Sequence, residues 1–159
     1  MFRICASAFA ALAVLAAGAV AGCGGDGAPS KHEFARNADE ICADVTERVT
    51  KLNRTRPQSI PEVKGYIDQL KRAVRDKNDR LKALERPDGA AGATAQQFTE
   101  TLDREDTEQV LPALNRLRQA VVNRDKKAFR AASKRLKAAQ SEKSDQLAAQ
   151  LGATRCATS

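Results

Sequence analysis

Apolar residues recur at spacings of three and four along four successive stretches of the chain. The stretches cover residues 34–52, 60–84, 98–121 and 129–151. This period places the apolar side chains on one face of an α-helix and leaves the charged side chains on the other. Amphipathic helices with short connections bury such stripes against one another. We therefore expect an all-α fold, an antiparallel up-down-up-down four-helix bundle over residues 31–159.

Polar residues at the ends of these stretches have the pattern of helix caps. Ser30 and Ser59 each precede a glutamate by three residues, which is the spacing of a capping box. Asp125 is the expected cap of the fourth helix, and Gly152 is expected to end it. These signals place the four helices between short polar connections.

Three residues interrupt the apolar stripes. Pro112 lies inside the third stripe and predicts a kink or a restart near Thr107, because proline lacks a backbone N–H and clashes with the preceding turn. Lys77 and Lys143 lie at positions where the periodicity predicts apolar side chains. We expect both lysines to extend their ammonium groups to solvent from the helix edge.

The first 22 residues have the composition of an export leader. Arg3 supplies a positive charge, and residues 4–22 carry none. This stretch is rich in alanine and glycine and ends in small residues, as secretory signal peptides do. An uncleaved signal anchor is the alternative, since a spanning helix needs about 20 residues. We expect residues 1–22 to be a cleaved signal peptide.

The leader ends in Val20-Ala21-Gly22-Cys23, an aliphatic residue and two small residues before a cysteine. This segment resembles the lipobox of bacterial lipoproteins. The resemblance implies that Cys23 becomes the first mature residue, carries a thioether-linked diacylglycerol and begins a tether over residues 23–30. The protein would then be lipid-anchored at the extracytoplasmic face of the cell membrane. The alternative is an ordinary thiol beside a chance cluster of small residues.

Two further cysteines, Cys42 and Cys156, remain in the mature chain. Such a pair in an exported protein generally forms a disulfide, and a bundle places the end of the fourth helix beside the first half of the first. A metal site and a catalytic dithiol are the alternatives. The sole histidine, His32, lies in the first helical turn, and the two cysteines are not closely spaced. We expect a structural disulfide.

Residues 33–43 read EFARNADEICA, and Leu151-Gly152 precedes Cys156. An early phenylalanine, alanine-aspartate and isoleucine-cysteine, with leucine-glycine and a cysteine at the end, are similar to a group of small helical lipoproteins of actinobacterial cell envelopes. The resemblance covers most of the mature chain but rests on few positions. It implies a helical extracytoplasmic domain with a terminal cysteine pair, and it supplies no activity.

No set of residues has the pattern of a catalytic or metal site. The histidine has no convincing nucleophile partner, and the glycines lie in the leader, the tether and the turns. The carboxylates between residues 100 and 108 lack the glycine turn of a calcium loop, so we expect a solvated helix face. The sequence therefore predicts a non-enzymatic protein without cofactor or metal. The scarcity of aromatic residues also argues against nucleic-acid binding.

Positive charge is concentrated between residues 124 and 137. Of the 27 Lys and Arg residues one lies in the leader, so the mature chain carries 26 against 20 acidic residues, a net charge of +6. The segment 124–137 holds seven basic residues and Asp125 alone as an acid, which is also +6. The residues that we expect to bind an anionic partner are Arg124, Lys126, Lys127, Arg130, Lys134 and Lys137.

The expected topology separates the charges along the bundle. The start of the fourth helix lies at the same end as the close of the first, and both are basic. The opposite end, which bears the lipid, would carry Glu33, Asp39, Glu40 and Asp44 with the carboxylates of residues 100–108. We expect a charge dipole whose basic pole projects away from an anionic membrane.

These features together favour a membrane-anchored binding or scaffold domain of the cell envelope. Its basic pole would hold an anionic polymer of the envelope or an acidic protein. The alternatives are a purely structural envelope lipoprotein, a helical sensor for a small apolar ligand, and an enzyme whose site is assembled from scattered residues.

Overall fold

The computed structural model describes residues 27–55, 57–139 and 142–158. The expected signal peptide and Cys23 lie outside these residues. The helices within them are α1 (Lys31–Arg54), α2 (Ile60–Ala83), α3 (Gly89–Glu105), α4 (Leu111–Val122), α5 (Lys126–Ala138) and α6 (Glu142–Leu151). A π-helical turn, η1 (Asp106–Val110), joins α3 to α4, and a 3-10 turn, η2 (Cys156–Thr158), follows α6. The described part of the chain contains no strand.

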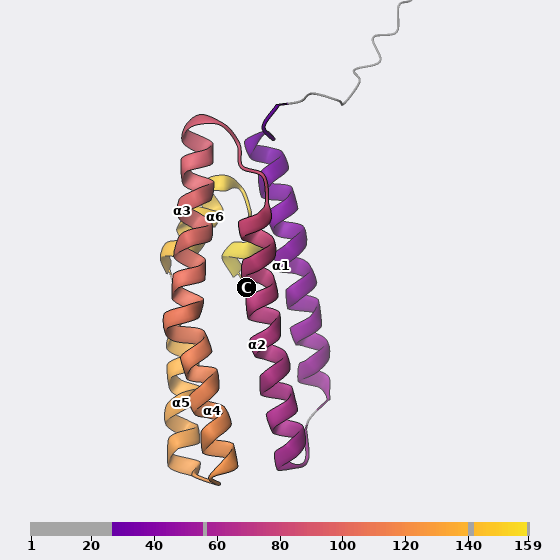
Figure 1. Cartoon of the computed structure of the whole chain (residues 1–159), viewed down its shortest axis with the longest axis vertical. Helices are drawn as coiled ribbons and strands as arrows, with labels where there is room; N and C mark the ends of the chain where they lie inside the picture. The colour runs from indigo at the N-terminus through magenta and orange to yellow at the C-terminus, as the bar shows by residue number, and fades with distance from the viewer. Residues whose placement is uncertain (1–26, 56, 140–141, 159) are drawn as a thin grey trace, which may run out of the picture.

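The helices form four antiparallel columns (Figure 1). The first two columns are α1 and α2, the third is α3 with η1 and α4, and the fourth is α5 with α6. Helix α2 packs against α1, α3 and α4, whereas α6 packs against α3 and α5 against α4. The expected all-α antiparallel bundle is therefore confirmed.

The predicted interruption of the third helix is also confirmed. The π-helical turn contains Thr107, and α4 starts again at Leu111 with Pro112 in its first turn. Proline is tolerated there because an N–H in the first turn of a helix has no partner within it. The third column thus consists of two helices joined by a register change.

The prediction of one continuous fourth helix is wrong. Helix α5 ends at Ala138 and α6 begins at Glu142. The two halves rest on different neighbours, α5 on α4 and α6 on α3. Because the third column changes register between those neighbours, a single straight helix would not follow both of them. The fourth column is consequently divided in the same way as the third.

The main hydrophobic core lies at the end of the bundle where α1 begins. Its largest fully buried side chains include Phe34, Phe98 and Leu81, which come from three different columns. Leu147 and Leu151 of α6 complete it from the fourth column. All members of this core cluster lie between Phe34 and Cys156. A domain that begins at Gly27 therefore contains the complete cluster.

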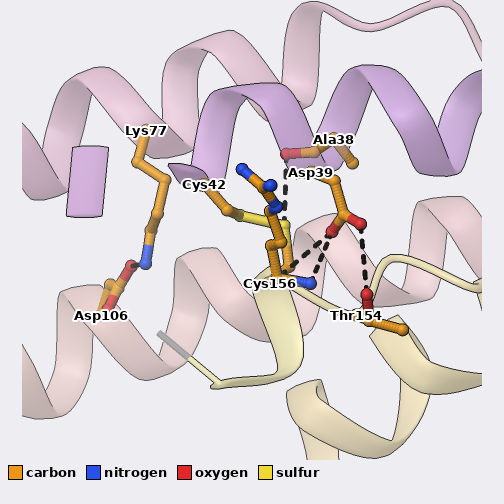
Figure 2. The surroundings of a disulfide bond; sticks show 8 residues. Ala38, Asp39, Cys42, Lys77, Asp106, Thr154 and Cys156 are labelled. Carbon is orange, nitrogen blue, oxygen red and sulfur yellow. Dashed lines mark hydrogen bonds and ion pairs between the residues drawn. A yellow bond between two sulfur atoms is a disulfide. The ribbon is translucent and has the colours of Figure 1, made fainter. Parts of the chain in front are cut away.

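The end of the chain is fastened to α1. Cys42 and Cys156 form the expected disulfide, with a Cα–Cα distance of 5.3 Å (Figure 2). The Asp39 carboxylate accepts hydrogen bonds from the backbone N–H groups of Arg155 at 2.8 Å and Cys156 at 3.3 Å. Gly152, with φ of +90°, ends α6 in the left-handed conformation that its position predicts. The tail that carries Cys156 is thus held by backbone and side-chain contacts as well as by the disulfide.

Candidate functional site

The six predicted anion-binding residues lie on one hairpin, formed by α4 and α5. Arg124 is in the turn between the helices, and the other five are in α5. All six are exposed. The turn is at the far end of the bundle from the start of α1 (Figure 1). The structure therefore brings these residues together on a surface that we call the basic hairpin, residues 122–137.

Backbone hydrogen bonds shape the turn of the basic hairpin. The N–H of Asp125 donates to the carbonyl of Ala120 at 2.9 Å, and the N–H of Arg124 donates to Val121 at 3.2 Å. This pair of bonds is a Schellman motif, in which the residue after the helix cap is left-handed and is usually glycine. Here that residue is Arg124, with φ of +54°. A cation therefore occupies the apex of the turn in a conformation that a β-carbon disfavours.

Asp125 is the expected cap of α5. One of its carboxylate oxygens accepts hydrogen bonds from the N–H groups of Lys127 and Ala128, both at 2.9 Å. These contacts hold the one acidic side chain of the segment at the helix N-terminus, where negative charge is favourable. The positive charges of α5 thus face solvent without an anion among them.

Ion pairing distinguishes the basic hairpin from several other basic residues at this end. Arg48 pairs with Asp76, Lys51 with Glu47 and Arg118 with Asp68. Within the described ranges, no ion pair involves any of the following side chains: Arg124, Lys126, Lys127, Arg130, Lys134, Arg135 or Lys137. Arg54 and Arg116 at the same end likewise take part in no ion pair among the described residues, so α5 holds the densest group of unpaired cations there but not all of them.

Small residues mediate the packing of α5. Ala132 is its one buried side chain, and a groove of about 430 Å³ is lined by residues of both α4 and α5. Phe129, which its periodicity places in the apolar stripe, is 41% exposed, and Val122 at the end of α4 is 42% exposed. Because Phe129 precedes Ala132 by three residues, it lies about 60° around the helix from the contact with α4. The helix therefore holds Phe129 at the edge of its packed face.

The predicted acidic pole is wrong in part. The carboxylates of residues 100–108 lie along the middle of the third column, where α3 meets η1 (Figure 1). Asp103 pairs with Lys82 at 2.8 Å and also accepts a hydrogen bond from Asn78. Asp44, another expected member, pairs with Arg80. The charges of Asp103 and Asp44 are therefore compensated by cations, whereas Glu100 and Glu108 are exposed without an ion pair among the described residues.

The prediction that Lys77 extends to solvent is also wrong. Its ammonium group lies 3.1 Å from the carboxylate of Asp106 in η1, and the two side chains are 12% and 7% exposed (Figure 2). Burial raises the pKa of Asp106, and the charge of Lys77 opposes that rise. Burial likewise raises the pKa of Asp145 in α6. Lys143, by contrast, is exposed as expected.

One alternative was a sensor for a small apolar ligand, which would need an enclosed apolar cavity. The groove between α1 and α2 is not such a cavity. That groove has a volume of about 640 Å³ and contains Leu52 and Ala73. Its other lining side chains are charged or polar, including Arg48, Lys51 and Arg72. Its chemistry is therefore closer to that of the basic end of the bundle than to an apolar pocket.

Neither a metal-binding cluster nor a membrane-spanning helix is present among the described residues. No group of three or more His, Cys, Asp or Glu side chains in the described ranges is arranged to hold a metal ion. None of the helices described here has the length and apolar character needed to cross a bilayer. Comparison with known proteins found no matching family model, no similar curated protein and no similar solved structure. The chemistry of the residues alone therefore carries the functional argument.

Proposed function

We propose that this protein is a lipid-anchored, extracytoplasmic binding domain that holds an anionic component of the cell envelope on its basic hairpin. The observation that carries the proposal is the set of exposed, unpaired cations on α5, at the end of the bundle away from the start of α1. A solvated surface of mixed charge would pair these cations with neighbouring carboxylates, as α1 and α2 do. Unpaired cations on one face instead favour a partner that supplies the anions.

The proposed anchor is a separate part of this function. The resemblance of residues 20–23 to a lipobox supports it, and α1 begins at Lys31, a few residues after Cys23. In the variant Cys23→Ser, the measured protein mass should no longer include the lipid. The protein should also move from the detergent phase to the aqueous phase. Unchanged detergent partitioning of the variant would refute the anchor and leave the hairpin proposal standing.

Charge neutralisation tests the binding function. The test variant combines Arg130→Gln, Lys134→Gln and Lys137→Gln on α5. The control variant removes the same charge from exposed residues near the other end of the bundle: Lys31→Gln, Arg36→Gln and Arg86→Gln. The probe is a column of immobilised polyglutamate, loaded with the oxidised domain from Gly27 onward. Since exposed interactions weaken with ionic strength, elution is followed along a salt gradient.

The two variants separate specific placement from net charge. We expect the test variant to elute at clearly lower salt than the control variant, and the control variant to elute close to the unmodified domain. Equal elution of the two variants would show that net charge alone governs retention. That result would refute the basic hairpin as a binding site and favour a purely structural envelope lipoprotein.

A further inference from the structure

Two exposed apolar side chains flank the turn of the basic hairpin. Val122 is the last residue of α4, and Phe129 lies in the first turns of α5. Among the described residues they are the large hydrophobic side chains that remain exposed. A single exposed apolar residue is ordinary in a folded protein. Two that border the same short turn, at one tip of the molecule, call for a specific contact.

Cations surround this apolar tip. With about 100° between successive residues of an α-helix, Lys126, Arg130 and Lys137 lie within about 100° of Phe129 on its solvent side. Lys127 and Lys134 continue the same face, and Arg124 lies at the apex of the turn. Helix α5 therefore presents a basic face that is bordered by an aromatic side chain.

The conformation of Arg124 is a further observation on the same tip. Glycine is the usual residue at this position of a Schellman motif, but here the residue is arginine, with φ of +54°. Non-glycine residues in this region carry strain, and such strain clusters at sites of recognition. The turn thus keeps a cation at the tip at some cost to folding.

We propose that the tip of the basic hairpin binds the surface of an anionic lipid bilayer. In this arrangement Phe129 and Val122 insert among the headgroups, and the cations of α5 contact lipid phosphates. The proposal rests on the proposed function, because it names the anionic partner of the same surface. Binding to a hydrated polyanion depends on charge alone. Binding to a bilayer interface is strengthened by cations and by adjacent apolar side chains together. The hairpin supplies both.

The observed charge distribution weakens the reason to expect the basic end to point away from the membrane. That expectation relied on an acidic pole, but Asp103 and Asp106 are paired with lysines in the middle of the bundle. A tether over residues 23–30 reaches about 25 Å at full extension, so the domain is able to tilt. The exposed face of α5 is then the surface with the strongest attraction to anionic lipid.

Vesicle flotation tests the proposal. The oxidised domain from Gly27 onward, which contains the complete core cluster, is mixed with vesicles of phosphatidylcholine containing one third phosphatidylglycerol. We expect the variant Phe129→Ser to bind these vesicles about tenfold more weakly, because it loses the free energy of burying an aromatic side chain. Phe129→Leu is expected to retain most of the binding. The same variants are measured on immobilised polyglutamate, where Phe129→Ser should elute with the unmodified domain.

A fluorescent reporter supplies an independent measurement. The chain contains no tryptophan, so Phe129→Trp introduces a single one. Its emission should shift to shorter wavelength with anionic vesicles and remain unchanged with polyglutamate or with pure phosphatidylcholine. Far-UV circular dichroism of each variant checks that the helices are intact, which we expect because Phe129 is exposed.

The outcomes distinguish the two proposals. If Phe129→Ser binds anionic vesicles as well as the unmodified domain, or if the tryptophan emission does not shift, insertion into lipid is refuted. Retention on polyglutamate that depends on the α5 cations would leave the more general binding function standing. If neutralising the α5 cations has no more effect than the control variant on either probe, both proposals fail.

Discussion

The buried pair of Lys77 and Asp106 predicts a large and pH-dependent loss of stability when the lysine is replaced. The Lys77 ammonium group is 3.1 Å from the Asp106 carboxylate, and both side chains are almost enclosed. In the variant Lys77→Met the side chain keeps a similar length but loses its positive charge. Asp106 is then a buried anion without its cationic partner, and breaking such a pair costs about 3–5 kcal/mol. We expect a loss of this size in the free energy of unfolding at pH 7.

Two matched variants separate the electrostatic cost from the loss of packing. Lys82→Met removes a lysine from the same helix that pairs with Asp103 at 2.8 Å, but those side chains are 43% and 35% exposed. An exposed pair contributes less than about 1 kcal/mol, so this variant should be close to the unmodified domain. The double variant of Lys77→Met with Asp106→Leu replaces both charges and should recover most of the loss.

The loss caused by Lys77→Met should depend on pH in a defined direction. Burial already raises the pKa of Asp106 in the folded state, and removal of Lys77 takes away the charge that opposes this rise. A carboxyl group with a raised folded pKa binds its proton more tightly in the folded state than in the unfolded one. The variant therefore regains stability, relative to the unmodified domain, as the pH falls from 7 toward the raised pKa and Asp106 becomes neutral.

Urea unfolding followed by circular dichroism at several pH values between 5 and 8 measures these differences. The variant and the unmodified domain are compared at each pH. The contributions of the other carboxyl groups to the pH dependence then cancel in the difference between the two free energies of unfolding. A loss below about 1 kcal/mol at pH 7, or a loss that does not change with pH, would contradict the assignment of a buried charge pair. Equal losses for Lys77→Met and Lys82→Met would contradict it as well.

Three other variants test the turn, the disulfide and the tail. Arg124→Gly should raise the free energy of unfolding by about 1 kcal/mol, because glycine adopts the left-handed conformation without the steric cost of a β-carbon; the urea midpoint measures this, and a lower midpoint would contradict the strain argument. Replacement of both Cys42 and Cys156 by serine should cost about 3–5 kcal/mol, since the bond closes a loop with a sequence separation of 114 residues. Thermal unfolding of that variant is compared with that of the unmodified domain with and without reductant; reductant should lower the midpoint of the unmodified domain alone, and equal midpoints for all samples would contradict a stabilising disulfide. Asp39→Ala removes the carboxylate that accepts from the N–H groups of Arg155 and Cys156, and it should speed hydrogen exchange at those two amides and reduction of the disulfide by dithiothreitol; an unchanged reduction rate would show that the tail does not depend on Asp39.

The elements that sequence reasoning predicted well depend on residues close together in the chain. The capping box at the start of α1 is an example, because Ser30 and Glu33 each bond the backbone of the other at 3.2 and 2.8 Å. The interruption near Thr107 follows from Pro112 for the same reason. The disulfide is a long-range feature that sequence also predicted, because only Cys42 and Cys156 remain if Cys5 is removed with the expected leader and Cys23 is lipidated, and a bundle places their segments side by side.

The burial of Lys77 was not predictable in this way. The lysine occupies an apolar position of its helix, and periodicity alone does not say which side chain lies opposite. Its partner, Asp106, belongs to the π-helical turn, where the usual helical spacing no longer assigns residues to faces. An aspartate within a run of carboxylates therefore appeared solvated in the sequence while the fold enclosed it. The sequence did contain a signal of this buried pair. Lys77 interrupts an apolar stripe, and Pro112 lies six residues after Asp106; both features indicate an irregular contact between columns.

The basic hairpin illustrates a second limit of periodicity, which concerns neighbours rather than faces. The spacing of Phe129, Ala132 and Leu136 predicts an apolar face correctly, but it does not tell how many helices cover that face. In the structure α5 packs mainly against α4, so Ala132 is enclosed while Phe129 at the edge is not. Sequence likewise shows the charge of Arg48, Lys51 and α5 as equivalent, although the first two residues are paired and α5 is not. The fold thus places a dense group of unpaired cations beside the exposed Phe129, and this combination is the basis of the proposed contact with a membrane.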